Sequence, residues 1–167
     1  MARTISIALL LGVVFSLIQG CNGSMTDHAF GIVDVLQDAI EAFEASRTEA
    51  DRKISSTSSS TLEKMQQPDP DVRLIASDWE REWDAVKDQI GDLEQDLGRV
   101  ERVAQAYFEE LDALAQGIMN PGTKREELRK NRELWTSWHD AYRAALRDIE
   151  QIRQLLQEGD DFHRVLL

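Results

Sequence analysis

Residues 71–119 read DVRLIASDWEREWDAVKDQIGDLEQDLGRVERVAQAYFEELDALAQGIM, and their apolar residues recur at alternating intervals of three and four. The apolar positions are Val72, Ile75, Trp79, Trp83, Val86, Ile90, Leu93, Leu97, Val100, Ala104, Tyr107, Leu111, Leu114 and Ile118. This heptad pattern predicts a long helix that packs in coiled-coil fashion, and the extra step of four from Trp79 to Trp83 predicts a local unwinding of the supercoil. With Asp69 as its cap and Pro70 in its first turn, the helix is expected over 70–119.

A second heptad segment follows after the short connection Asn120-Pro121-Gly122. Thr123 and Glu126 form a capping box, and Gly159 is a typical helix stop, so we expect this helix over 123–158. Its predicted seam comprises Leu128, Asn131, Trp135, Trp138, Tyr142, Ala145, Ile149, Ile152 and Leu156. Two long helices joined by a short turn run antiparallel. This arrangement places Trp135 and Trp138 opposite residues 104–108, and Trp79 and Trp83 opposite residues 159–163.

The remaining helix is expected over 26–65, with a less regular apolar stripe. The stripe comprises Phe30, Val33, Leu36, Ile40, Phe43, Ala50 and Ile54. Residues 55–61 are all Ser or Thr, a run that fits either a flexible linker or a weak continuation of the helix, and we favour the helix because Leu62 and Met65 resume the apolar phase. Without strand-like alternation, the sequence predicts an all-α, elongated, antiparallel three-helix bundle over 26–167.

The first twenty residues have the pattern of an export signal, with Arg3 followed by a mostly apolar run from Ile5 to Ile18. That run is shorter than the roughly 20 residues that a membrane-spanning helix needs. Ile18-Gln19-Gly20-Cys21 resembles the bacterial lipobox, which implies cleavage after Gly20 and acylation of Cys21. The alternative is an ordinary free thiol. The lipobox interpretation divides the chain into a signal peptide (1–20), a lipidated tether (21–25) and the bundle.

The lipobox places the chain in the bacterial cell envelope, anchored by its acyl chains. Asn22 follows the cysteine, where an Asp usually marks retention in the inner membrane of Gram-negative bacteria. We therefore expect an outer-membrane lipoprotein that faces the periplasm.

Composition disfavours several classes of function. The 167 residues include 31 acidic and 19 basic side chains, a net charge of −12, whereas a nucleic-acid binder needs a basic face. One cysteine cannot form an internal disulfide or a thiolate metal cage. His28, His139 and His163 lack the spacing of a zinc or di-iron site, and no catalytic constellation is evident. We expect no enzyme, no metal and no cofactor.

Two further groups of residues are candidate sites. Lys124, Arg125, Arg129, Lys130 and Arg132 form a basic cluster that suits anionic lipid headgroups, although a solvated helix face explains it equally simply. An aromatic pocket between the helices would involve Phe30, Tyr107, Trp135 and Trp138, although core packing also accounts for aromatic residues in heptad phase.

Asn131 is a polar residue within the predicted seam. It is either a register lock or ligand contact inside the bundle, or a residue that water satisfies at a loosely packed helix start.

Four segments carry a resemblance to a known family: Ile90-Gly-Asp-Leu-Glu, Val103-Ala-Gln-Ala-Tyr-Phe-Glu-Glu-Leu, Ile118-Met-Asn and Glu127-Leu-Arg. Together with the lipobox and the helix order, they resemble an uncharacterised family of bacterial α-helical envelope lipoproteins, a domain of unknown function. The C-terminal signature of that family is not present in Phe162-His-Arg-Val-Leu-Leu. The resemblance implies the architecture and brings no activity.

The sequence therefore favours a non-enzymatic scaffold or protein-interaction module on the membrane, whose partner is an envelope protein or a second copy. The alternative is a small-ligand-binding bundle that uses the aromatic pocket.

We predict that Cys21 carries the lipid. Palmitate labelling of the wild-type chain should give a membrane-bound species, because acyl chains hold it at the bilayer. Cys21→Ser should lose both the label and the fractionation with membranes. If the serine variant stays with the membranes to the same extent, the segment is an uncleaved anchor and the lipobox interpretation is wrong.

Overall fold

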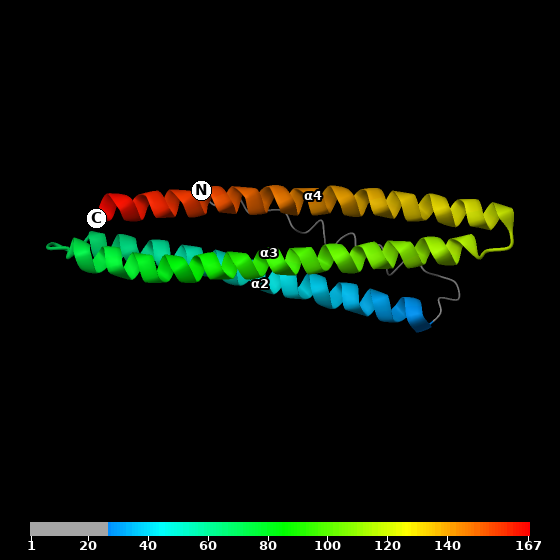
Figure 1. Cartoon of the computed structure of the whole chain (residues 1–167), viewed down its shortest axis with the longest axis horizontal. Helices are drawn as coiled ribbons and strands as arrows, with labels where there is room; N and C mark the ends of the chain where they lie inside the picture. The colour runs from blue at the N-terminus through cyan, green and yellow to red at the C-terminus, as the bar shows by residue number, and fades with distance from the viewer. Residues whose placement is uncertain (1–26) are drawn as a thin grey trace. The chain divides into compact units, whose positions relative to one another are not determined.

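The chain folds into a bundle of three helices, as the heptad pattern predicts. The computed structural model describes residues 27–167, and the side chains from Gly31 onward. The helices are α2 (Asp27–Met65), α3 (Val72–Gln116) and α4 (Pro121–Leu166), shown in Figure 1. Across residues 27–167 there is no β-strand, which confirms the all-α class. The signal segment and Cys21 lie outside the described residues.

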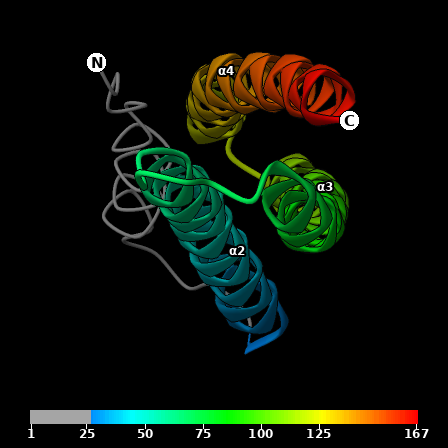
Figure 2. The same cartoon turned by 90° about the vertical axis from the view of Figure 1, so that its left-hand side faces the viewer.

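All three helices pass through two compact units of the chain. In its described part, unit 1 contains residues 27–40 and Gly98–Asp148, including the turn between α3 and α4. Unit 2 contains Glu41–Leu97 and Ile149–Leu167, including the turn between α2 and α3. At the C-terminal end of α4, unit 2 has one helix at each corner of a triangle (Figure 2). Each unit has its own apolar core.

The predicted seam of α3 forms the centre of both cores. In unit 2 its residues from Ile75 to Leu97 are each at most 6% exposed, and in unit 1 Val100, Ala104 and Tyr107 are at most 2% exposed. The ends of the seam are less buried, since Leu114 and Ile118 are half-buried and Val72 is 46% exposed. Val72 lies in the first turn of the helix, and the buried seam begins only at Ile75 and Ala76.

The Ser and Thr run of α2 is helical throughout, so it is a continuation of the helix and not a linker. Thr57 and Thr61 lie in the apolar phase and are each 5% exposed. Residues with weak helix propensity form helix here because tertiary packing outweighs intrinsic preference. The interior of unit 2 accepts small side chains at these two positions.

Both connections between helices start the following helix with a side-chain cap. Asp71 Oδ1 accepts hydrogen bonds from the backbone N–H groups of Arg73 and Leu74, each at 3.1 Å. Asn120 Oδ1 accepts from Gly122 N at 2.9 Å and Thr123 N at 3.1 Å. These bonds satisfy orphan donors of the first turn. The predicted starts at 70 and 123 were therefore wrong by two residues each, because Asp71 and Asn120 are the caps.

The predicted ends of α3 and α4 need larger corrections. Helix α3 ends at Gln116 and not at 119, since Gly117 N donates to the carbonyls of Ala113 and Leu114 and closes the last turn. Helix α4 does not stop at Gly159 but continues to Leu166. Gly159 is a buried residue inside the helix. The helix continues through Gly159, and the absence of a side chain there leaves room for a neighbouring residue.

Two stacked indoles explain why residue 159 is a glycine. Trp79 and Trp83 lie with ring centroids 4.7 Å apart, and a Cβ on Gly159 would overlap ring atoms of Trp83. Trp79 Nε1 donates to the carbonyl of Gly159 at 3.1 Å, and Trp83 Nε1 donates to that of Leu156 at 3.3 Å. The predicted pairing of these tryptophans with residues 159–163 is confirmed, since Trp79 also meets Phe162 edge to face.

We predict that Gly159→Ala lowers the free energy of unfolding by about 1–3 kcal/mol, because the methyl group displaces the Trp83 indole and overpacks the core. Gly91 is the matched control, also inside a helix but with open space where a Cβ would lie. Gly91→Ala should raise stability by about 0.5–1 kcal/mol through helix propensity alone. Urea unfolding monitored by circular dichroism measures both. Equal stabilisation by the two substitutions would contradict the indole packing at Gly159.

Candidate binding groove

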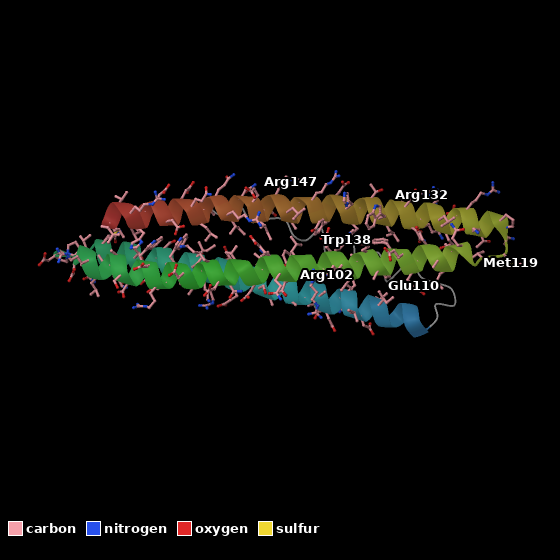
Figure 3. All side chains as sticks on the ribbon, viewed as in Figure 1. Arg102, Glu110, Met119, Arg132, Trp138 and Arg147 are labelled. Atoms are coloured by element: carbon pink, nitrogen blue, oxygen red, sulfur yellow. The ribbon has the colours of Figure 1, made fainter. Side chains whose placement is uncertain are left out.

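Two of the four residues of the predicted aromatic pocket, Tyr107 and Trp138, belong to the core. Each is 2% exposed, and Trp138 lies between α4 and α3 (Figure 3). Trp138 stacks on Tyr142 at 6.3 Å, and Tyr107 meets Phe108 edge to face at 5.3 Å. The side chain of Phe30 lies outside the described residues.

Tyr142, which stacks on Trp138, also interacts with Glu101 of α3. Burial raises the pKa of the Tyr142 phenol to about 12, and a hydrogen bond with Glu101 contributes to the shift. The phenol therefore stays neutral throughout the physiological range. This part of the predicted pocket is a closed contact between α3 and α4.

Trp135 lies at the edge of the seam and not within it. Its side chain is 40% exposed, whereas Leu134, the preceding residue, is half-buried. The buried residues Trp138, Ala141 and Ala145 follow at heptad spacing from Asn131, so Leu134 holds the seam position that we assigned to Trp135. Trp135 meets Phe108 edge to face at 5.1 Å and stacks on His139 at 5.8 Å.

A groove of about 310 Å³ lies between α3 and α4 beside Trp135, entirely within unit 1. Helix α3 contributes Gln105, Phe108, Glu109 and Asp112, and helix α4 contributes Asn131, Arg132 and Trp135. The volume falls at the lower end of the range of about 300–1,000 Å³ for small-molecule sites. The groove combines an exposed indole, a phenyl ring and several polar side chains.

Asn131 anchors the polar part of the groove. It is 8% exposed, and its Nδ2 donates to Asp112 Oδ1 at 2.9 Å. Further along α3, Gln105 Nε2 donates to Glu109 Oε1 at 2.9 Å. The protein partner of Asn131 supports the register lock, since a shift of α4 along α3 would leave a largely buried amide without this bond.

Two residues of the basic cluster, Arg129 and Lys130, are paired with acidic neighbours on the same helix. Arg129 bonds both Glu126 and Glu133 at 2.6 Å, and Lys130 bonds Glu127 at 2.8 Å. The bond to Glu126 is the main cause of the raised pKa of Arg129, and the same bond lowers the pKa of Glu126. All these groups are exposed to solvent, so the pairs contribute little to stability.

The other three basic residues differ from this pattern. Lys124 Nζ donates to the Gln116 carbonyl at 2.9 Å, across the turn between α3 and α4. Arg125 Nε donates to the Pro121 carbonyl at 3.2 Å. Arg132 lines the groove. The cluster is thus not one continuous cationic surface.

The groove contains residues that sequence reasoning did not select. Gln105, Phe108, Glu109 and Asp112 lie outside the predicted seam, yet antiparallel pairing about the turn already placed Phe108 opposite Trp135. The same pairing brings Asp112 to Asn131. The register of the two helices could have identified these groove residues from the sequence. A seam defined by apolar residues alone leaves out polar neighbours such as Asp112.

Metal-binding clusters and membrane-spanning helices are both absent from residues 27–167. Among these described residues, no group of three or more His, Cys, Asp or Glu side chains could hold a metal ion. Within the same part of the chain, no helix is long and apolar enough to cross a membrane.

No family model, curated protein or solved structure matches the chain. The resemblance to envelope lipoproteins therefore stays a prediction.

We predict that Asn131→Asp destabilises the bundle by about 1–3 kcal/mol at neutral pH, because two carboxylates then face each other where a hydrogen bond stood. Repulsion raises the pKa of one carboxyl in the folded state, so the folded chain binds a proton more readily than the unfolded chain. The difference in unfolding free energy between the wild type and Asn131→Asp should therefore become smaller as the pH falls from about 7 to 5. Thermal melts across this range measure it.

The reciprocal control is the double variant Asn131→Asp with Asp112→Asn, which reverses the direction of the bond. It should recover most of the stability at neutral pH. A single variant that melts like the wild type at every pH would show that residues 112 and 131 do not interact.

Proposed function

We propose that this chain is a lipid-anchored, non-enzymatic helical scaffold of the bacterial cell envelope, facing the periplasm. The export signal and the lipobox-like Ile18-Gln19-Gly20-Cys21 support the anchor. The filled heptad cores of both units support the scaffold, since they hold the surface residues of each unit in a defined geometry.

The locked register of α3 against α4 is the observation that carries the proposal. In unit 2 the indoles of Trp79 and Trp83 bond the backbone of α4, and in unit 1 Asn131 bonds Asp112. A displacement along the helix axis would break these bonds and leave buried donors unsatisfied. Helices held in one register present their outer side chains at constant spacing, which a protein-interaction surface requires.

Exposed apolar side chains offer contacts for a partner. Leu74 and Leu155 in unit 2 are 59% and 48% exposed, and Leu146 in unit 1 is 44% exposed. When a second protein covers large apolar side chains, their removal from water lowers the free energy and favours association. The partner is an envelope protein or a second copy of this chain.

A photo-crosslinker at these positions tests the scaffold proposal in living cells. A benzoylphenylalanine at position 74, 155 or 146 should give at least one discrete crosslinked product whose identity is reproducible. The polar, exposed Gln151 is the matched control position. Cys21→Ser should abolish the product, because it removes the protein from the membrane. If no apolar position gives more crosslinking than position 151, the scaffold proposal is wrong.

We further propose that the basic cluster adds a weak headgroup contact near the anchor. The beginning of α2 and the turn at 117–120 both belong to unit 1, so the tether emerges from the unit that carries the cluster. Lys124, Arg125 and Arg132 have no carboxylate partner within 4.0 Å among the described residues. They are the main source of attraction, at about 1 kcal/mol per charge near the surface.

We predict that a chain beginning at Asn22 binds anionic vesicles weakly, and less as salt rises from about 50 to 150 mM, because the screening length falls to about 8 Å. Replacing Lys124, Arg125 and Arg132 by Gln should remove most of this binding in a flotation assay. The matched control replaces Arg129 and Lys130, whose charges are already paired, and should have less effect. Absence of wild-type binding at low salt would mean that repulsion by the net negative charge outweighs this contact. That charge is −13 for a chain beginning at Asn22, because the −12 of the whole chain includes Arg3.

Small-ligand binding is a second candidate function, which the groove beside Trp135 favours. The groove is formed by side chains of two helices in one unit and includes Trp135, which is 40% exposed. It is compatible with the scaffold, because ligand and partner would use different surfaces.

A further inference from the structure

We propose that the groove between α3 and α4 binds a neutral saccharide, with one pyranose ring against Trp135. This inference rests on the second candidate function, the ligand-binding groove, and does not depend on the scaffold. Its evidence is the aromatic face in the groove and the polar groups that surround it.

Trp135 provides the flat surface. Its indole contacts Phe108 edge to face and stacks on His139, and the residue remains 40% exposed. An immobilised ring loses little entropy when a ligand binds. The negative face of an indole attracts the weakly positive C–H groups on the face of a pyranose. Trp135 therefore has the properties of a stacking platform.

The polar lining selects a ligand that both donates and accepts hydrogen bonds. Glu109 and Asp112 carry carboxylates, which only accept, whereas Arg132 carries a guanidinium, which only donates. A hydroxyl group does both, so a polyhydroxylated ring can satisfy donors and acceptors that line the same groove. Asn131 and Gln105 already donate to these carboxylates and hold them in place.

The mixed charge of the lining disfavours ligands that carry charge of a single sign. A cation would be attracted by Glu109 and Asp112 but repelled by Arg132, and an anion would meet the opposite combination. The groove admits only part of an extended ligand, because its volume of about 310 Å³ is at the small end of binding sites. We therefore expect one or two sugar rings, bound with a Kd of millimolar order, as suits a groove that is open to water.

NMR titration of the full chain tests this proposal through its indole N–H signals. The probes are cellobiose, maltose and N,N′-diacetylchitobiose, with the zwitterion betaine and the cation lysine for comparison. At least one disaccharide should shift the Trp135 indole signal with saturation. The signals of Trp79 and Trp83 serve as internal references. In unit 2 their indole N–H groups already donate to the backbone carbonyls of Gly159 and Leu156, respectively.

Variants of the groove identify the contacts. Trp135→Ala should weaken saccharide binding about tenfold or more, as expected for loss of an aromatic contact. Val165→Ala is the control, since Val165 is 82% exposed on the same helix and outside the groove. Arg132→Gln should weaken binding by a smaller factor, because the amide still donates. Binding of a neutral sugar should not change between low and high salt.

The outcomes separate the ligand class from the groove itself. Saturable shifts with lysine or betaine, but not with any disaccharide, would overturn the saccharide proposal and leave the binding groove in place. A lack of saturable shifts with all five probes would overturn both. Saccharide shifts that persist unchanged in Trp135→Ala would also contradict the proposal, because the ligand would then bind elsewhere.

Discussion

The hydrogen bonds from two stacked indoles to the backbone of α4 are the constraint on which unit 2 depends. Trp79 and Trp83 place large rings where a heptad seam normally carries aliphatic side chains, and both indole N–H groups are withdrawn from water. A buried donor without an acceptor costs free energy comparable to the hydrogen bond itself. The carbonyls of Leu156 and Gly159 satisfy the donors, and the absence of a side chain on Gly159 makes room for the Trp83 ring. Axial position and rotation of α4 follow from this contact.

In unit 1 a hydrogen bond between two polar side chains, and not an indole, defines the position of α4. Asn131 occupies a seam position, and its partner Asp112 defines the axial position of α4 against α3. This polar pair lies at the level of the exposed Trp135, where the seam is completed by Leu134 and the indole is left at the flank. The contact that locks the register therefore also lines the groove. A binding site that shares residues with a structural lock is preorganised, because its side chains are positioned before any ligand arrives.

The three proposed roles, anchoring, scaffolding and ligand binding, make separate demands on the chain. The proposed anchor depends on Cys21 and the residues before it, whereas the proposed scaffold needs helices held in one register with apolar side chains at their surface. The groove needs only part of unit 1. Its mixture of carboxylates, a guanidinium and an indole contrasts with the paired charges of Glu126, Arg129 and Glu133, which satisfy one another and leave little for a partner.

The sequence by itself determined the helix count, the seam of α3 and the pairing of its tryptophans with residues 159–163, because heptad spacing and a short turn define which side chains face one another. Only the tertiary structure decided the meaning of Gly159 and Trp135. A glycine stops an isolated helix, yet Gly159 lies within one because Trp83 occupies the space of its side chain. Leu134 and Trp135 both fit the apolar pattern, and only the packed helices show that Leu134 is half-buried whereas Trp135 is 40% exposed. Local sequence specifies the period of a helix, whereas packing volume determines which neighbour enters the core.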